Sequence, residues 1–232
     1  MAVQSSPLHV YLLAGVKTTT CAFNACKEKL ETQLRSEGVD PVIRVLFPYG
    51  DCSRSVIRQV LEVRSDLSNR MKAGRIGGRN VWEQLKDSVK DEEGRFLLIG
   101  HSGGGAAAYQ AAKMLEENGM IRDFRVVQVG SPRTPIHPRL QDKVSYFHSI
   151  DRDGKQNDPI TRIGTWGGWI RKGRSVPRWS RFKYAPGYVE GIPVIGGHAD
   201  YFRNSEPFVD TEAVCNLDKT IGRVGAWLKG WL

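Results

Sequence analysis

The feature that most constrains this chain is a regular alternation along its sequence. Short apolar runs rich in β-branched residues are separated by longer segments with the three-to-four-residue period of helices. This alternation is typical of a mostly parallel sheet whose faces are covered by helices. We therefore expect an α/β fold with three α/β/α layers. The predicted strands are residues 9–13, 42–47, 96–99, 124–129 and 144–147, with a sixth at about 192–195.

Three helices are predicted in the first half of the chain. The first has an apolar stripe at steps of three and four and ends near Gly38, so its apolar face should pack on the sheet. The second is expected from Ser53 to about Ala73, and the third from Asn80 to about Lys90. The stripe of the first helix is Phe23, Cys26, Leu30 and Leu34, and the broad apolar face of the second is Val56, Ile57, Val60 and Leu61.

The C-terminal segment has the clearest helical pattern. We expect a helix docked on the sheet rather than one lying in a membrane, because core-facing helices commonly have this pattern. Asp210 or Thr211 is suited to cap its first turn. The recurring apolar positions are Val214, Leu217, Ile221, Val224, Leu228 and Trp231.

The composition is that of a globular protein. The chain has 232 residues, of which 40% are hydrophobic and 25% are charged, so it is long enough to bury a sizeable core. It contains no internal repeat and no Pro/Gly-rich linker that would divide it. We therefore predict one domain over residues 1–232.

Cysteine usage and the N-terminus bear on the cellular compartment. The four cysteines form no C-x-x-C pair and are too sparse for a disulfide scaffold, so we expect reduced thiols and no metal site. No Lys or Arg precedes the first apolar run, which indicates a strand rather than a signal peptide. No stretch approaches the roughly 20 apolar residues of a membrane span. These features predict a cytoplasmic protein. The cysteines are Cys21, Cys26, Cys52 and Cys215.

The net charge of +9 is concentrated in one segment. No acidic residue lies between Asp158 and Glu190, and the texture predicts an irregular basic and aromatic excursion at about residues 162–190. It is either a solvated surface loop or a surface for acyl chains or an anionic membrane. Nucleic acid is not the expected partner, because no binding module accompanies the charge. The cations are Arg162, Arg171, Lys172, Arg174, Arg178, Arg181 and Lys183, and the aromatic residues are Trp166, Trp169, Trp179, Phe182, Tyr184 and Tyr188.

The chemistry is indicated by a G-x-S-x-G motif between an apolar run and an Ala-rich helix. Gly100 and Gly104 flank Ser102 by two residues on either side, and a sharp strand-to-helix turn needs small residues there. The turn would expose the Ser102 hydroxyl and aim helix N–H groups at a developing oxyanion. A phosphate-binding loop is not favoured, because no G-K-[S/T] follows. The motif predicts a nucleophilic serine.

A serine nucleophile needs a histidine base and an acid that orients it, which follow the serine in the order acid then histidine. His198 is the one histidine that follows every plausible acid, since His137 and His148 come too early. The acid is open at this stage. Asp151 lies nearest the end of the fifth strand and is preferred on geometry, while Asp153 and Asp158 also follow that strand.

Four segments in order resemble the class 3, fungal-lipase-like group of the α/β-hydrolase superfamily. They are Gly100-His101-Ser102-Gly103-Gly104, Gly130-Ser131-Pro132-Arg133, Asn157-Asp158-Pro159-Ile160 and His198-Ala199-Asp200-Tyr201. The resemblance implies an α/β-hydrolase fold with Ser102 as nucleophile, Asp158 as acid and His198 as base. It also implies the Gly103 amide as one oxyanion donor, and a second donor from residues 14–17, most readily the Val16 amide.

Three departures from the family pattern are evident. The first strand matches the third strand of the family, which implies a pared-down sheet. The loop at residues 150–157 is longer than in the family and keeps Asp151 open as the acid. No lid helix is evident before the serine motif, which argues against interfacial activation.

We therefore expect a serine hydrolase that cleaves carboxylic esters, lipid-like ones in particular, through an acyl-enzyme. The expected partners are a small ester or lipid and, through residues 162–190, an anionic membrane surface. No cofactor or metal is required. Two alternatives remain: an acyltransferase or thioesterase with the same triad, and a non-catalytic module that binds an anionic surface.

Overall fold

The computed structural model describes residues 7–19, 21–51, 53–67, 75–90, 93–171, 173 and 176–232. Among the sequence predictions, Cys52, Lys172, Arg174 and the end of the helix expected at residues 53–73 lie outside the described residues.

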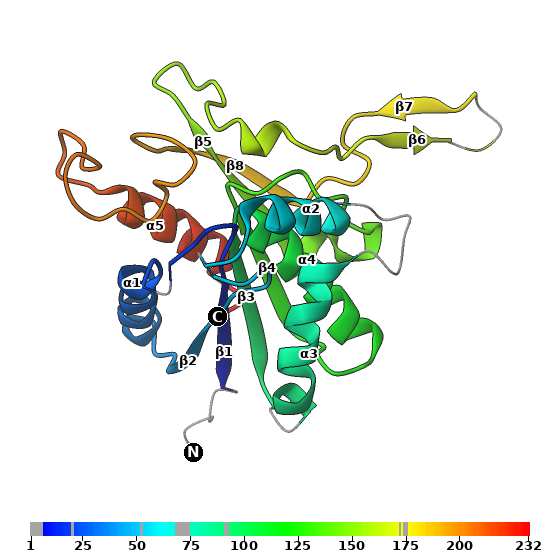
Figure 1. Ribbon diagram of the computed structural model, residues 1–232, viewed down its shortest axis with the longest axis horizontal. Coiled ribbons are helices and arrows are strands. Elements are labelled where there is room, and N and C mark those ends of the chain that lie inside the picture. Colours follow the sequence, from blue (N-terminus) through cyan, green and yellow to red (C-terminus); the bar gives the residue numbers. More distant parts are fainter. Residues whose placement is uncertain are drawn as a thin grey trace.

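Six parallel strands form the central sheet in the order β2-β1-β3-β4-β5-β8 (Figure 1). The predicted α/β class with a pared-down parallel sheet is confirmed. The strand expected at residues 192–195 begins earlier and ends at Pro193. The strands are β1 (Leu8–Leu13), β2 (Pro41–Leu46), β3 (Arg95–His101), β4 (Phe124–Val129), β5 (Val144–Ile150) and β8 (Tyr188–Pro193).

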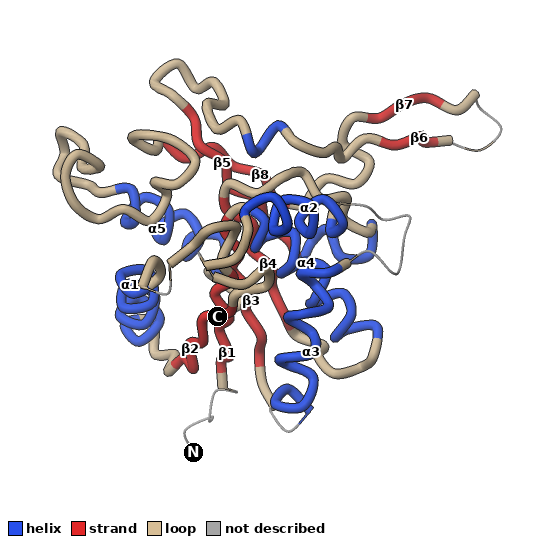
Figure 2. Tube along the Cα trace, viewed as in Figure 1, coloured by secondary structure: helices blue, strands red, loops and turns tan. Residues whose placement is uncertain are grey.

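Helices cover both faces of this sheet (Figure 2). The alternation of side chains in β1 shows why two layers are needed, because Leu8, Val10 and Leu12 enter one core while Tyr11 and Leu13 enter the other. The first core is closed by α1 (Asn24–Ser36) and α5 (Asn216–Leu228), and the second by α3 (Ile76–Lys90) and α4 (Gly103–Glu117).

Helix α2 (Val56–Asp66) forms where predicted but buries a different face. Its four predicted apolar residues are exposed: Val56 39%, Ile57 74%, Val60 54% and Leu61 58%. The buried residues are Gln59, Val63 and Asp66. Polar contacts fix this orientation, since the Gln59 side chain donates to the Asp51 carbonyl and accepts from the Lys17 amide. The apolar face of α2 is therefore free for contacts outside the core.

The start of the last helix differs from the prediction. Cys215, not Asp210 or Thr211, is the N-cap of α5, and its sulfur accepts from the Asp218 amide. Asp210 instead accepts from the amides of Glu212 and Val214 in the preceding turn. The local turn satisfies the carboxylate before the helix begins, so the cap prediction was wrong.

The basic excursion is more ordered than expected. It contains an antiparallel hairpin, β6 (Gly168–Ile170) and β7 (Arg178–Ser180), which projects away from the sheet (Figure 1). Two short 3₁₀ helices, Pro138–Lys143 and Ile160–Arg162, precede it. Among the described residues, the helices are all too short or too polar to cross a bilayer.

Candidate active site

Ser102 lies in the sharp turn between β3 and α4, with φ 57° and ψ −132°. This is a strained backbone for a residue with a side chain. The glycines of the motif are required by packing, because a Cβ on Gly100 would lie 2.3 Å from the Gly104 carbonyl, and one on Gly104 would lie 2.2 Å from the Leu13 carbonyl. The turn therefore presents the Ser102 side chain at the carboxyl edge of the sheet.

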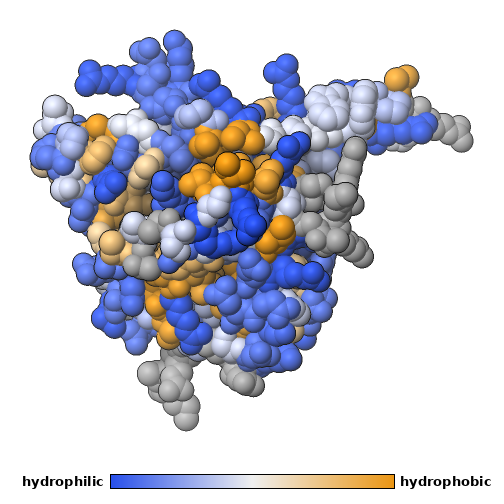
Figure 3. Space-filling view, in the orientation of Figure 1, coloured by the Kyte–Doolittle hydropathy of each residue, from blue (hydrophilic) through white to orange (hydrophobic). Residues whose placement is uncertain are grey.

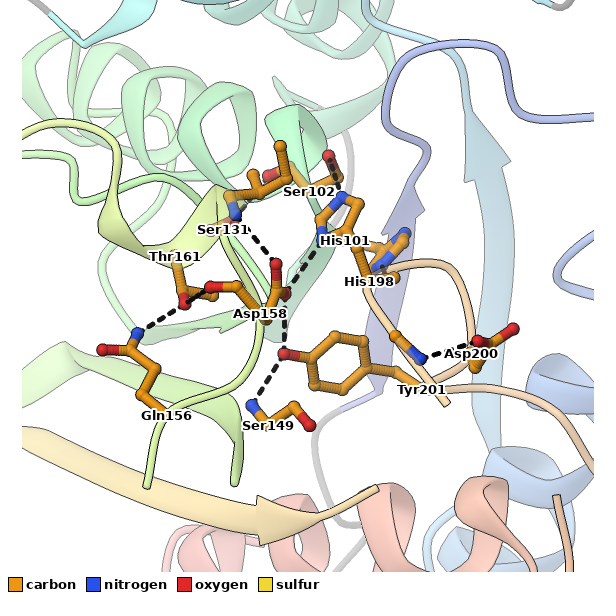
Figure 4. Close-up of polar contacts among 12 residues, drawn as sticks. His101, Ser102, Ser131, Ser149, Gln156, Asp158, Thr161, His198, Asp200 and Tyr201 are labelled. Atoms are coloured by element: carbon orange, nitrogen blue, oxygen red, sulfur yellow. Dashed lines mark hydrogen bonds and ion pairs between the residues drawn. The ribbon is translucent and has the colours of Figure 1, made fainter. Parts of the chain in front are cut away.

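The structure brings three of the predicted side chains together (Figure 4). His198 Nε2 lies 2.8 Å from Ser102 Oγ, and His198 Nδ1 lies 2.9 Å from Asp158 Oδ2. The serine comes from the β3–α4 turn, the acid from the loop after β5, and the histidine from the loop after β8. With the carboxylate accepting from Nδ1–H, Nε2 is left free to accept the serine proton.

Asp158 is fully buried and fully hydrogen-bonded. Its Oδ2 also accepts from the Tyr201 hydroxyl at 2.9 Å, and its Oδ1 accepts from the Ile160 amide at 2.9 Å. Burial by itself would raise the pKa of Asp158, but the hydrogen bonds and the charge of His198 outweigh it and hold the pKa below its usual value. The group is therefore a carboxylate at neutral pH.

The other candidates from the sequence lie elsewhere. Asp151 Oδ1 accepts from the amides of Asp153 and Lys155 and so closes its own turn. His137 is the N-cap of the Pro138–Lys143 helix, where its Nδ1 accepts from the Arg139 amide. His148 is a half-buried residue of β5. Proximity in sequence to the strand end did not decide which carboxylate contacts His198, because the loop after β5 places Asp158 against the His198 ring.

Comparison with known proteins gives a consistent result. Residues 59–167 match the model of the family described as lipase (class 3). No match was found among curated proteins.

Solved structures with a similar fold include a thioesterase and a second bacterial gene product. The RedJ thioesterase from the prodiginine biosynthetic pathway of Streptomyces coelicolor superposes with a TM-score of 0.55 at 15% identity, covering 96% of this chain and 91% of that one. The lin2722 gene product of Listeria innocua superposes with a TM-score of 0.51 at 12% identity, covering 98% and 95%. At these identities the likeness shows the fold alone.

The chain thus has a fold similar to these structures, and its residues 59–167 are similar to the lipase (class 3) family. The family match contains Ser102 and Asp158 and ends before His198, so the contacts of His198 with these two residues come from the structure.

The two predicted oxyanion donors belong to segments that lie close to Ser102. Gly103 is the first residue of α4, so its amide lies at the positive end of the helix. The loop after β1 passes close to the serine, since a Cβ on Gly15 would lie 2.7 Å from Ser102 Cβ. Val16 follows in this loop and lines both cavities that open on Ser102. Glycine at position 15 is what permits this approach.

Two cavities of different character meet at Ser102, and Val16, Ser102 and His198 line both. We call them the apolar arm, about 640 Å³, and the polar arm, about 470 Å³. The further lining of the apolar arm is Val60, Val63, Arg64, Leu67, Gly103, Pro132, Ile160, Ile163 and Gly164. That of the polar arm is Lys17, Thr18, Thr19, Cys21, Ala22, Phe23, Ala25, His101, Ala199, Phe202, Arg203 and Asn204.

Sequence analysis missed the contacts of two residues at this site. His101 is the variable position of G-x-S-x-G, and its Nε2 lies 3.0 Å from the His198 carbonyl while the two rings stack at 5.1 Å. Burial, with the nearby His198, lowers the pKa of His101 to about 4, so it is neutral and donates to that carbonyl. Tyr201 accepts from the Ser149 amide and donates to Asp158. In the sequence, these contacts were indicated only by the positions of the two residues, His101 beside Ser102 and Tyr201 three residues after His198.

Proposed function

We propose that this protein is a serine hydrolase that cleaves carboxylic esters with an apolar acyl group. The observation that carries the proposal is the continuous chain of contacts from Ser102 Oγ through the His198 ring to Asp158. His198 Nε2 takes the proton of Ser102 as Oγ bonds to the ester carbonyl carbon. The carbonyl π electrons move to oxygen and form the tetrahedral oxyanion.

The second half of the reaction restores the enzyme. The C–O bond to the alcohol breaks, and the leaving oxygen takes the proton from His198. A water then gives its proton to His198 and attacks the acyl carbon, and the acid leaves as Ser102 regains its hydrogen. In both tetrahedral states the Gly103 and Val16 amides would donate to the oxyanion, each worth about 3 kcal/mol. Asp158 stays ionised throughout and orients the imidazole.

The apolar arm is suited to hold the acyl group. Its lining is aliphatic apart from Ser102, His198 and Arg64, and Arg64 is an exposed residue of the last turn of α2. The exposed apolar face of α2 adjoins this arm through Val60, and apolar side chains gather at this face of the molecule (Figure 3). An acyl chain entering here would replace water on an apolar surface.

A thioesterase is the second candidate for the same site. The triad and oxyanion donors act on the carbonyl in the same way whether an alcohol or a thiol leaves, and the similar structure from Streptomyces coelicolor is described as a thioesterase. The two candidates differ only in the leaving atom.

A fluorophosphonate probe and a series of aryl esters test the proposal. Covalent labelling of Ser102, with hydrolysis that increases from acetyl to longer acyl chains, would support it. Absence of labelling with intact folding would instead indicate a non-catalytic module. A parallel series of thioesters measures which leaving atom is preferred.

We also propose that the β6–β7 hairpin contacts an anionic membrane. Trp169 and Trp179 pack edge to face and are 62% and 52% exposed, and Arg178 beside them is exposed. Exposed Trp with cations suits the interface of an anionic bilayer. Trp166 takes no part, contrary to the sequence prediction, because it is buried edge-on against Tyr146.

Vesicle binding tests this contact. Arg178→Gln with Arg181→Gln should weaken binding to vesicles of phosphatidylglycerol and phosphatidylcholine by about 1 kcal/mol per cation, and added salt should do the same. Lys90→Gln with Arg122→Gln, exposed cations at the opposite edge of the sheet, is the matched control. Equal binding by both double variants would contradict the proposal.

A further inference from the structure

The two arms that meet at Ser102 differ in charge. Among the described residues, the lining of the polar arm includes the cations Lys17 and Arg203 and no carboxylate. The apolar arm has Arg64 only, at its exposed rim. A substrate bound across Ser102 must place its acyl part in one arm and its leaving group in the other, so the arms distinguish the two ends of the substrate.

Lys17 is available for a ligand. Its amide is held by Gln59 at 2.8 Å, which fixes the backbone beside Val16. Its side chain is exposed and forms no ion pair with any described residue. Lys17 thus follows the proposed oxyanion donor Val16 in the chain, and its ammonium group has no counter-ion among the residues that the structure describes.

Arg203 adds a second charge that is only partly compensated. Its Nε lies 3.6 Å from Asp200 Oδ1, but Asp200 is also engaged, since its Oδ2 accepts from the Gly197 amide at 2.8 Å. The Arg203 side chain is 60% exposed and lines the polar arm, and its guanidinium lies 5.9 Å from the centre of the Phe208 ring. The first turn of α1, which also lines this arm through Ala25, contains no acidic residue. The local potential of the polar arm is positive.

We infer that the leaving group of the substrate carries a phosphate, which binds in the polar arm against Lys17 and Arg203 while the acyl chain lies in the apolar arm. This inference rests on the proposed function and adds the chemical class of the leaving group. A tetrahedral dianion matches two cations of different geometry, one a point charge and one a planar fork. A phosphoglycerol alcohol and a phosphate-bearing thiol share this chemistry.

Two substrate pairs with the same eight-carbon chain test the inference. The ester pair is 1-octanoylglycerol 3-phosphate against 1-octanoylglycerol, and the thioester pair is octanoyl coenzyme A against octanoyl N-acetylcysteamine. We expect kcat/KM to be roughly five- to tenfold higher for the phosphate-bearing member of at least one pair, because two exposed cations contribute modestly each. The ester pair identifies a lipid headgroup as the source and the thioester pair identifies a thiol carrier.

Variants then assign the preference to the polar arm. Lys17→Gln with Arg203→Gln should reduce the ratio of the two kcat/KM values to near one, and Lys17→Arg should keep it. Lys90→Gln with Arg122→Gln should leave the ratio as in the wild type. Because the double variant could fold poorly, the salt dependence of the wild-type ratio is a second measurement, and the ratio should fall as ionic strength rises.

The outcomes separate the two proposals. If both neutral substrates are cleaved as fast as their phosphate-bearing partners, the inference is overturned while the hydrolase function stands. If no substrate is cleaved and the fluorophosphonate does not label Ser102, the proposed function fails and the inference with it. A phosphate preference that survives the double variant would also overturn the assignment to Lys17 and Arg203.

Discussion

Two buried carboxylates are each linked to the Ser102 turn through one side chain, Asp158 through His198 and Asp66 through Tyr49. Asp158 and Asp66 both have no exposed surface, and each accepts a hydrogen bond from a tyrosine hydroxyl, Tyr201 at 2.9 Å and Tyr49 at 2.8 Å. Their pKa values nevertheless move in opposite directions. That of Asp158 lies below the usual value, whereas burial raises the pKa of Asp66 to about 6.

The difference in pKa comes from the charge of the other donors, because Asp158 and Asp66 each also accept from backbone amides. Asp158 binds the His198 ring, which carries a positive charge once it has taken a proton. The other donors to Asp66 are the amides of Gly77 and Gly78, which stay neutral and only partly offset the cost of burial. Of these two carboxylates, only Asp158 contacts a side chain that can accept the serine proton. Asp66 instead joins the end of α2 to the start of α3.

The largest expected loss of kcat follows removal of Ser102 or His198, the two residues linked to Asp158. Ser102→Ala or His198→Ala should lower kcat for an activated aryl ester by about 10⁶-fold, because triad members act as a unit. Steady-state hydrolysis measures this, with Ser36→Ala at the exposed end of α1 as control. Thermal unfolding close to that of the wild type should show that the fold is kept. An active Ser102→Ala protein would end the hydrolase proposal.

The next largest change in kcat should distinguish Asp158 from Asp151 as the partner of His198. Asp158→Asn should lower kcat by about 10⁴-fold, because the amide no longer selects the imidazole tautomer that accepts the serine proton. Asp151→Asn should change kcat less than threefold, since Asp151 only closes its own turn. The same ester assay applies to both variants. The reverse ranking would show that another acid serves His198.

Asp66 should affect stability through its ionisation. Its pKa is about 6 in the folded state and about 3.9 when unfolded, so its stabilising contribution is complete below pH 4 and is lost as the pH rises through 6. The free energy of unfolding of the wild type relative to Asp66→Asn should therefore fall by about 2 kcal/mol between pH 4 and pH 7.

Urea unfolding at several pH values measures this difference. Asp153→Asn removes an exposed carboxylate and serves as the control for loss of one negative charge. A relative stability of Asp66→Asn that does not vary with pH would show that Asp66 does not titrate in this window.

The smallest effect distinguishes the two tyrosines. Tyr201→Phe removes a donor to Asp158 and leaves the Ser149 amide unpaired, so kcat should fall about tenfold. Tyr49→Phe removes a donor to Asp66 and should change kcat by no more than about threefold, although the Tyr49 hydroxyl also lies 3.1 Å from the Gly103 carbonyl. Both variants should lose about 1–3 kcal/mol of stability. Equal losses of kcat in the two variants would mean that Tyr49 and Asp66 also position Gly103, the proposed oxyanion donor.

The local sequence determined the central sheet and the turn at Ser102. Alternation in β1 and in the other strands specifies a sheet with both faces covered, because each strand must bury both sets of side chains. Gly100 and Gly104 specify the turn that exposes Ser102, because no larger residue fits between the strand end and the helix. These are contacts within one strand-turn-helix unit, so the sequence can show them.

The tertiary structure decided which of several similar residues contact one another, and which face of α2 is buried. Asp158 rather than Asp151 reaches His198 because the loop after β5 folds back, and its path depends on Tyr201, which lies 43 residues away in the chain. The apolar face of α2 faces outward because Gln59 and Asp66 bind distant backbone groups. A hydrophobic stripe predicts that a helix has an apolar face, but only the partners across the fold decide whether that face is buried or left open beside the site.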